Sequence, residues 1–422
     1  MIHPDREARS ASRNPDARLE EAVGLALALD LEIRETQVVR LRSLTPATLF
    51  GKGKVEEIRQ TIELIEADVA IVDDALTPVQ QRNLEKAWQV KVIDRTGLIL
   101  EIFARRARTR EGRLQVELAR LNYEKSRLVR TWTHLERQRG GFGVMGGPGE
   151  TQIETDRRLL AEKIGKLKAE LKEVRRTRTL QRSARKRHPY PTVALVGYTN
   201  AGKSTLFNRL TKSEVVAQDM LFATLDPTLR MLKLPDGRPA IMSDTVGFIS
   251  DLPHELVEAF RATLEEVKEA DVVLHVRDIS SPESNAQAGD VREVLGRLDF
   301  DFDERAILEV WNKIDLVPTD DREPIGGDAR RAHPPAIVAS AVTGEGCADL
   351  LAAVAALVDE APPVDVYAPA GEGAAIAWLY RHGRVINRAD GKDGSVHLAV
   401  SLSPQALGQF EQQFPTSEIR GH

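Results

Sequence analysis

Eight residues, Gly197 to Ser204, have the types and spacing of a loop that binds phosphate. They read GYTNAGKS, or G-x-x-x-x-G-K-S, between the strand-like TVALVG and the helix-forming STLFNRL. The glycines let backbone N–H groups wrap phosphate oxygens, and the helix N-terminus adds partial positive charge. Lys203 would reach the β- and γ-phosphates, and Ser204 would be a ligand of Mg²⁺. The residues expected to contact nucleotide here are Gly197, Tyr198, Thr199, Asn200, Ala201, Gly202, Lys203, Ser204 and Thr205.

Three short elements downstream extend this loop into a guanine-nucleotide site. The Asp244 carboxylate, after the strand-like PAIMS, suits Mg²⁺ held through water, and the Gly247 N–H could meet a γ-phosphate. The Asp315 carboxylate, in NKID after AILEVW, can accept both the N1–H and the N2 amino hydrogens of guanine, and adenine offers no matching pair. Backbone N–H groups near Ser340 could contact guanine O6. The residues expected to contact nucleotide are Asp244, Thr245, Val246, Gly247, Asn312, Lys313, Ile314, Asp315, Ser340, Ala341 and Val342.

The segment LFATLDPT lies between the phosphate loop and Asp244 and predicts a mobile loop that closes on Mg²⁺ when a γ-phosphate is present. Thr224 is the expected hydroxyl ligand and Thr228 the competing candidate, and either threonine could instead only cap a turn. The predicted metal ligands are therefore Ser204 and Thr224. The residues of this segment expected to contact nucleotide are Phe222, Ala223, Thr224, Leu225 and Asp226.

The predicted catalytic groups are Lys203, Thr224 and Gly247. Ras-like enzymes place a Gln after D-x-x-G to orient the attacking water, but here that residue is Phe248, which cannot bind water. We therefore expect slow intrinsic hydrolysis, with a partner or a rearranged loop completing the site. Asn200 gives the loop the form G-x-x-N-x-G-K-S, which resembles GTPases that bind a monovalent cation, so K⁺ is a second candidate ion.

A second glycine-rich stretch, RQRGGFGVMGGPGETQIETDRR (137–158), contains G-x-G-x-x-G at Gly141, Gly143 and Gly146. A dinucleotide-binding turn must follow a strand and open a helix, but this stretch lies between two helices with heptad spacing, which argues against a cofactor role. Two such helices joined by a short loop fold back on one another. The apolar positions are Leu114, Leu118, Leu121, Leu128, Trp132 and Leu135 before the loop, with Lys125 also on this stripe, and Ile153, Leu160, Ile164, Leu167, Leu171 and Val174 after it.

Alternating helical and strand patterns before the hairpin predict a parallel sheet. The predicted domains are a disordered tail (1–18), an N-terminal α/β domain (19–104), a helical hairpin (105–188) with a glycine-rich tip loop (139–150), a P-loop α/β domain with a mostly parallel sheet (189–362) and a small C-terminal α+β domain (363–422). In the last domain AAIAWLYRHG and SVHLAVSL are predicted as strands and SPQALGQFEQQF as a helix. Two other polar features, FGKGK (50–54) and Asp73-Asp74, are interpreted as a loop and a strand end.

Composition is that of an ordinary soluble globular protein, with 42% hydrophobic and 29% charged residues. One cysteine, no secretory signal and no long apolar run predict a cytoplasmic protein without a transmembrane segment. The net charge of −5 hides a basic block: residues 101–190 carry 24 Lys and Arg against 11 Asp and Glu. This block suggests a surface for a polyanion, although charge alone favours a solvated helical surface.

Taken together, GYTNAGKSTLFN, FATLDPT, DTVGFI, NKID, FGKGKVEEI and GGPGETQIETDRR resemble the HflX family of translational GTPases, over about residues 20–360. The resemblance implies an α/β N-terminal domain, a helical hairpin, a Ras-like G domain and often a small C-terminal domain. It also implies a cytosolic, guanine-nucleotide-dependent factor that binds the large ribosomal subunit and splits or rescues stalled ribosomes, notably under heat stress. A hydrophobic residue in place of the catalytic Gln is a trait of the family, whose hairpin loop approaches the peptidyl transferase centre. One departure is Arg277 in HVRDIS, which puts the end of that strand in doubt.

We therefore expect a monomeric, Mg²⁺-dependent GTPase switch whose basic hairpin and linker contact ribosomal RNA. The alternative is a G-protein binding module in ribosome assembly or signalling, whose nucleotide state controls docking to a protein or, peripherally, to a membrane. ATP use by the N-terminal domain, for which FGKGK is the sequence hint, is not expected.

Overall fold

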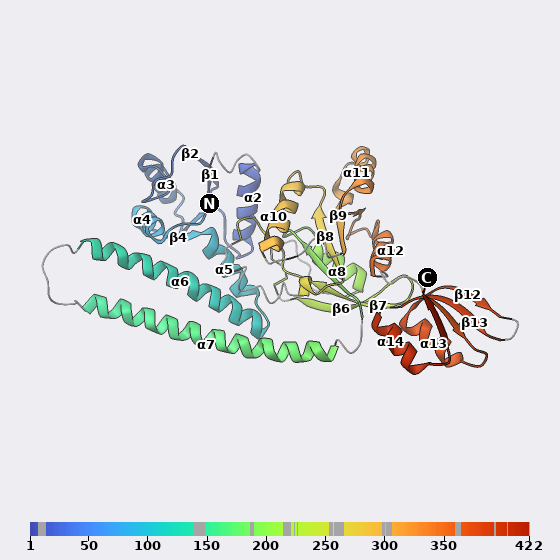
Figure 1. Cartoon of the computed structure of the whole chain (residues 1–422). Helices are drawn as coiled ribbons and strands as arrows, with labels where there is room; N and C mark the ends of the chain where they lie inside the picture. The colour runs from blue at the N-terminus through green and yellow to red at the C-terminus, as the bar shows by residue number, and fades with distance from the viewer. Residues whose placement is uncertain are drawn as a thin grey trace.

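A computed structural model of the chain shows three sheets and one long helical hairpin in succession (Figure 1). It agrees with the predicted fold class of an α/β N-terminal domain, a hairpin, a P-loop domain with a mostly parallel sheet and a small α+β domain. The structure describes all residues except 7–13, 139–147, 186–189, 214–220, 223, 226, 253–255, 257–265, 298–299, 301–305, 359–363, 392–393, 403 and 422.

The N-terminal domain is a four-stranded parallel sheet with strand order β2-β1-β3-β4. Local signals set its helices: α4, for example, begins with a capping box between Thr77 and Gln80 and buries Leu84 and Trp88, one turn apart. The strands and helices predicted between 19 and 104 are present. The elements are β1 (Ile2–Arg6), α2 (Pro15–Leu27), β2 (Gln37–Leu41), α3 (Lys52–Leu64), β3 (Val69–Val72), α4 (Pro78–Trp88), β4 (Lys91–Asp94) and α5 (Arg95–Arg106).

The prediction that residues 1–18 form a disordered tail is wrong where the structure describes them. Strand β1 lies between β2 and β3, and α2 begins at Pro15 behind an Asn14 cap. The strand escapes detection because its sequence, IHPDR, is polar. Its polar groups are neutralised inside the fold: His3 Nδ1 lies 2.8 Å from Asp73 Oδ2, and Arg6 pairs with Asp74.

The hairpin consists of two long helices, α6 (Arg110–Gln138) and α7 (Pro148–Arg185), which run side by side (Figure 1). Their stripe buries Leu114, Leu121, Ile164, Leu167 and Leu171, as the heptad spacing predicts. An ion pair of 2.8 Å between Lys163 and Glu117 crosses the two helices. The tip residues 139–147 and the side chains of Leu128, Trp132, Leu135 and Ile153 lie outside the described residues.

The P-loop domain has a six-stranded sheet with strand order β10-β9-β8-β5-β7-β6, parallel except for β6. Helices α8 and α12 cover one face, and α10 covers part of the other. Strand β8 continues past Arg277, whose guanidinium pairs with the buried Glu309 at 2.7 Å, so a charged residue is accommodated there. The elements are β5 (Thr192–Gly197), α8 (Lys203–Thr211), β6 (Thr228–Lys233), β7 (Pro239–Asp244), β8 (Val272–Asp278), α10 (Ser284–Arg297), β9 (Ala306–Asn312), α11 (Thr319–Arg331), β10 (Ala336–Val338) and α12 (Cys347–Val358).

One hydrophobic core joins the N-terminal domain to the P-loop domain. Helices α2 and α5 contribute Leu25, Ile99 and Phe103, and these pack in one cluster with Phe222 and Phe248 of the P-loop domain. The rings of Phe103 and Phe222 meet edge to face with centroids 4.6 Å apart. The contact between the two domains therefore includes buried apolar side chains as well as polar ones.

The C-terminal domain is a four-stranded antiparallel sheet with strand order β12-β13-β11-β14. The predicted strand in AAIAWLYRHG is wrong: these residues form α13, because Ala375 and Leu379 recur at helical spacing and both are buried against the sheet. The predicted strand in SVHLAVSL and the predicted helix in SPQALGQFEQQF are present. The elements are β11 (Val364–Ala368), α13 (Gly373–His382), β12 (Arg384–Asp390), β13 (Val396–Ser401), α14 (Pro404–Gln413) and β14 (Glu418–Gly421).

Deletion of residues 1–6 should abolish cooperative unfolding of the N-terminal domain, because it removes an internal strand of the sheet. Thermal unfolding followed by circular dichroism checks this. The control is Arg34→Ala, which breaks an exposed pair with Glu32 and should change stability by about 1 kcal/mol or less. An unfolding curve that the deletion leaves unchanged would restore the interpretation of a dispensable tail.

Candidate functional site

The loop between β5 and α8 has the backbone shape that its glycines predict. Gly197 and Gly202 have φ angles of 154° and 90°. A Cβ on Gly197 would lie 2.2 Å from the carbonyl oxygen of Val276, and one on Gly202 would lie 2.3 Å from the Asn312 side chain. Only glycine fits at either position. The loop and the N-terminus of α8 therefore form a compact cradle held against two neighbouring strand ends.

Lys203 lies inside this cradle and is 6% exposed. Its Nζ donates a hydrogen bond of 2.7 Å to the carbonyl oxygen of Tyr198. Burial lowers the pKa of Lys203 to about 8, although the charge of Asp244 opposes the shift. A Cβ added to Gly247 would lie 3.0 Å from Lys203 Nζ, so the D-x-x-G element approaches the lysine closely. An anion bound in the cradle would restore the favourable environment for the charged amine.

Ser204, Thr224 and Asp244 converge from three separate segments. Ser204 Oγ lies 2.9 Å from Thr224 Oγ1, and the two hydroxyls donate to Asp244 Oδ2 at 2.7 and 2.9 Å. Thr228 instead begins β6 and pairs across the strands with the backbone of Asp244. The structure thus brings the predicted Thr224 to Ser204.

The donor set of this cluster fits Mg²⁺. Mg²⁺ prefers oxygen ligands, and this cluster offers two hydroxyl oxygens and a carboxylate oxygen that lie 2.7–2.9 Å from one another. Asp244 Oδ1 is buried and has no hydrogen-bond partner in the described structure. Burial raises the pKa of Asp244 despite hydrogen bonds from Ser204 and Thr224 and the charge of Lys203. A divalent cation would supply the countercharge that this carboxylate lacks.

The residues predicted to recognise a base lie at the ends of β9 and β10. Asn312 joins the two neighbouring loops, because its Nδ2 donates to the Ala201 carbonyl at 2.8 Å and its Oδ1 accepts from the Ala341 N–H at 2.9 Å. Lys313 has a φ of 67° and pairs with Asp278 at 2.8 Å. Asp315 Oδ1 is a buried oxygen without a partner in the described structure. This unpaired acceptor is what recognition of two N–H groups requires.

The backbone N–H groups expected to contact guanine O6 already donate hydrogen bonds within the chain. The Ser340 N–H donates to the Glu345 carbonyl at 2.9 Å, and the Ala341 N–H donates to Asn312. A contact from either group to a guanine oxygen would replace an existing bond. Val342 is 66% exposed beside them.

The remaining predicted contacts lie on the two segments beside the cradle. Phe222, Leu225, Thr245 and Val246 are buried, Thr199 Oγ1 is buried without a partner, and Asn200 is exposed with a φ of 58°. Thr205 lies in the first turn of α8, and Ile314 opens a short 3₁₀ turn. Ala223 and Asp226 lie outside the described residues.

Phe248 is held by the backbone as well as by its side chain. Its N–H donates to the Gly197 carbonyl at 3.1 Å, and its carbonyl accepts from the Thr199 N–H at 2.7 Å. The ring is 2% exposed in the core shared with the N-terminal domain. The Phe248 side chain therefore cannot orient water, as the sequence predicts.

The sequence did not reveal that the N-terminal domain contacts this site directly. Tyr198 in the cradle donates to Glu21 of α2, and Arg95 of α5 binds Ser250 two residues beyond Phe248. These contacts join positions 155 to 177 residues apart, which a single sequence does not pair. The sequence placed charged residues at the strand ends, but it did not identify the residues that pair with them.

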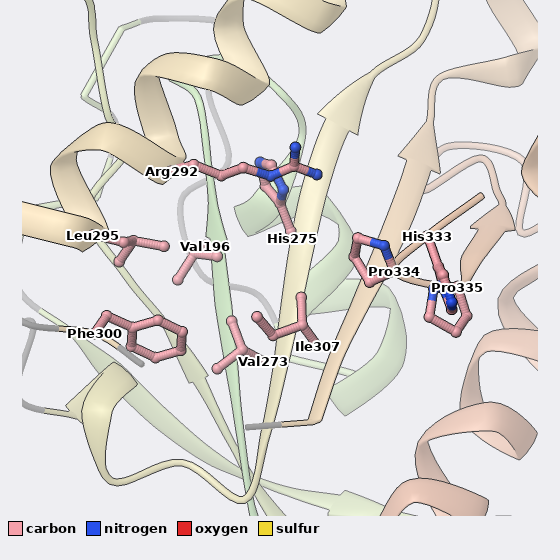
Figure 2. A pocket seen from close by; sticks show the side chains of 10 residues that line it. All are labelled: Val196, Val273, His275, Arg292, Leu295, Phe300, Ile307, His333, Pro334 and Pro335. Atoms are coloured by element: carbon pink, nitrogen blue, oxygen red, sulfur yellow. The ribbon is translucent and has the colours of Figure 1, made fainter. Parts of the chain in front are cut away.

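Other candidate features bring no further chemistry to the site. In FGKGK, the loop interpretation is wrong beyond Gly51: Phe50 is buried, Gly51 caps α3, and residues 52–54 form its first turn, where Lys54 pairs with Glu57 at 2.7 Å. Figure 2 shows a cavity of about 560 Å³ that contains none of the predicted site residues; its lining residues are Val196, Val273, His275, Arg292, Leu295, Phe300, Ile307, His333, Pro334 and Pro335. Among the described residues, no helix is long and apolar enough to cross a bilayer.

Comparisons with known proteins match four consecutive parts of the chain. Family models described as GTP-binding GTPase N-terminal, GTP-binding GTPase middle region, 50S ribosome-binding GTPase and HflX C-terminal domain match residues 16–104, 106–185, 192–313 and 329–419. A GTPase HflX of Magnetococcus marinus is 53% identical over 397 residues, covering 93% of this chain and 90% of the relative. A GTPase HflX of Escherichia coli is 46% identical over 358 residues, covering 85% and 83%. A crystal structure of a GTP-binding protein from Sulfolobus solfataricus with GDP covers 85% of this chain and 99% of that one, at 23% identity and a TM-score of 0.43.

The affinity for GDP, measured without Mg²⁺, should fall by up to about tenfold per pH unit above about pH 8. The free Lys203 loses its proton there, whereas bound phosphate favours the charged amine. Titration calorimetry between about pH 7.5 and 9 measures the slope. Lys203→Arg is the control, because arginine stays charged over this pH range and any ionisation of guanine would affect both proteins equally. A wild-type slope equal to that of the arginine variant would contradict the buried-lysine account.

Proposed function

The chain belongs to the HflX family of GTPases, and from that premise we propose that it uses GTP as a switch to bind the large ribosomal subunit and to split or rescue stalled ribosomes under stress. It hydrolyses GTP to GDP and phosphate. The part of this proposal that concerns the ribosome is supported by the match to a family described as a 50S ribosome-binding GTPase. We propose further that the protein acts as a cytoplasmic monomer.

The observation that most strongly supports a GTP-operated switch is the cluster of Ser204, Thr224 and Asp244. Thr224 comes from a segment separate from the phosphate loop, yet its hydroxyl lies 2.9 Å from that of Ser204, so both could be ligands of one Mg²⁺. A residue that can be a metal ligand only when its segment is closed is the usual means of detecting a γ-phosphate. Bound Mg²⁺ would supply positive charge that offsets the negative charge of the triphosphate.

The residues of this chain would divide the remaining tasks. Backbone N–H groups from Gly197 to Ser204 would hold phosphate oxygens, and Lys203 would add a positive charge. The Asp315 carboxylate, whose Oδ1 has no partner among the described residues, would accept the two N–H groups of guanine, while Asn312 keeps that loop against the phosphate loop. The Gly247 N–H would meet the γ-phosphate. The exposed Asn200 keeps K⁺ as a proposed second ion.

Hydrolysis in the free protein should be slow, because Phe248 occupies the position of a water-orienting Gln. Its ring is buried in the core and both its backbone polar groups are bonded, so a small side-chain rotation cannot replace the missing group. We propose that the bound ribosome completes the site, by an added group or by rearranging this segment.

The hairpin is the proposed contact with ribosomal RNA. Its region has 13 more basic than acidic residues, since residues 101–190 contain 24 of the former and 11 of the latter. The side chains of Arg110, Arg158 and Arg176 are 72–75% exposed, so they can reach phosphates. The glycine-rich tip would enter a narrow RNA cavity in which side chains would clash.

GTP turnover should rise strongly when large ribosomal subunits are added. Turnover with and without subunits measures this, and co-sedimentation with a non-hydrolysable GTP analogue measures binding. Binding through RNA phosphates should weaken steeply with salt, with a log–log slope of about −0.7 to −0.9 for each phosphate contact. Deletion of 140–149 should preserve nucleotide binding and reduce the stimulation.

Two results would contradict the proposal. Subunits that neither stimulate turnover nor bind in a nucleotide-dependent way would remove the ribosomal function. Nucleotide-dependent binding that survives high salt would favour the alternative, a G-protein module that docks on a protein surface.

A further inference from the structure

Two adjacent residues at the junction of β4 and α5, Asp94 and Arg95, contact different parts of the molecule. Both are buried, with 1% and 3% of their surface exposed. Asp94 accepts hydrogen bonds from the hairpin helix α6, whereas Arg95 donates to the segment that follows the D-x-x-G element. The hairpin and the nucleotide site are thus linked through one short piece of backbone.

On the nucleotide side, one nitrogen of Arg95 binds two oxygens of Ser250. Its Nη2 donates to the Ser250 carbonyl at 3.0 Å and to the Ser250 Oγ at 2.9 Å. The same Ser250 donates its N–H to the Tyr198 hydroxyl at 2.8 Å and its Oγ to Glu21 at 2.9 Å. Ser250 is therefore fixed by the phosphate loop and by the N-terminal domain together.

Ser250 cannot move independently of the site that detects the γ-phosphate. It lies three residues after Gly247, and the intervening Phe248 is bonded through both backbone groups to Gly197 and Thr199 of the phosphate loop. A displacement of Gly247 toward a phosphate would therefore reach Ser250 along three residues of chain. The apolar neighbours Phe248 and Ile249 pack in the core shared with α2 and α5, so the same displacement would act on these helices.

Arg95 resists release from this contact. Its Nη1 also donates to Asp73 at 2.6 Å and its Nη2 to Glu21. Separation from Ser250 would remove hydrogen bonds from a charged group in a buried site, which is unfavourable. Movement of the N-terminal domain together with Ser250 avoids this cost.

On the hairpin side, Asp94 uses both carboxylate oxygens. The Tyr123 hydroxyl donates to Oδ1 at 2.6 Å, and Arg127 Nη2 donates to Oδ2 at 2.7 Å. The Arg127 guanidinium also lies 3.9 Å above the ring of Tyr123. Since Val116 and Ala119 of α6 pack in the same core, this helix follows the β4–α5 junction as a unit.

We propose that the Asp94–Arg95 junction is a relay that couples the nucleotide state at Gly247 and Ser250 to the orientation of hairpin helix α6. The relay deepens the proposed GTP switch but requires no ribosome. Through this relay, bound GTP would change the orientation of the RNA-contacting hairpin. A hairpin held by its target would in turn change the relative affinities for GTP and GDP. Arg95 and Arg127 are positioning residues in this account, since neither touches the nucleotide.

Hydrogen–deuterium exchange of the full-length protein tests the relay without ribosomes. Wild-type protein with GDP and with a non-hydrolysable GTP analogue should differ in exchange both at 244–252 and at 114–127. In Arg127→Met the difference at 244–252 should persist, while the difference at 114–127 should be lost. Arg113→Met is the matched control, because Arg113 lies on the same helix and its side chain is exposed.

The ratio of the affinities for the two nucleotides is a second readout, because a general destabilisation of the fold would leave this ratio unchanged. The ratio of affinities for the GTP analogue and GDP should change by about fivefold or more in Arg127→Met, the range of ordinary allosteric coupling, and should stay constant in Arg113→Met. Simple destabilisation would weaken both nucleotides together. Arg95→Met should give the same change in ratio if it folds, but it removes the buried positive charge that Asp73 and Glu21 both contact, so the decisive variant is Arg127→Met.

Two results would overturn the relay. The first is a wild-type protein whose 114–127 exchange is the same with both nucleotides. The second is an Arg127→Met protein that keeps the wild-type exchange difference and the wild-type affinity ratio. Either result would leave the ribosomal function standing, and a failure of subunits to stimulate turnover would leave the relay standing, so the two proposals fail separately.

Discussion

The architecture depends on one buried guanidinium, that of Arg95. A charge with 3% exposure is tolerated only when every neighbour is arranged to compensate it, and removal of one partner from such a pair typically costs about 3–5 kcal/mol. Burial lowers the pKa of Arg95, but Asp73 and Glu21 outweigh it and raise the value above normal. Burial likewise raises the pKa of Asp73, yet Arg95 and His3 bring it down to about 2. Strand β3, helix α2 and the Ser250 segment must therefore all meet at this point.

This constraint explains why the catalytic segment carries a phenylalanine. Phe248 lies between the phosphate loop and the core shared with the N-terminal domain, so its side chain serves packing and its backbone serves positioning. A glutamine there would bury an amide among Leu25, Ile99 and Phe103 without evident partners. The protein has an anchored switch segment where Ras-like enzymes have a water-orienting group. The proposed dependence of hydrolysis on a partner rests on that exchange.

Sequence patterns predicted the features that depend on residues close together in the chain. Glycine spacing gave the cradle, strand ends gave Asp244 and Asp315, and heptads gave the hairpin. Strand β1 was missed because its polar residues are neutralised by distant partners, and α13 was misassigned because a short apolar run does not distinguish helix from strand. The links from Tyr198 and Ser250 to Glu21 span 177 and 229 positions, and no local pattern reports them. The most informative contacts for regulation are thus the least visible in one sequence.

The most direct test of the coupled switch is the distance between the hairpin and the P-loop domain in each nucleotide state. Spin labels at Arg158→Cys on α7 and Glu293→Cys on α10 lie at exposed positions, with side chains 72% and 62% exposed. The native Cys347 does not compete for label, because it is buried and burial raises the pKa of its thiol. Pulsed electron resonance should show different distance distributions with GDP and with a non-hydrolysable GTP analogue. Identical distributions would contradict the account, since the hairpin would then be indifferent to the nucleotide.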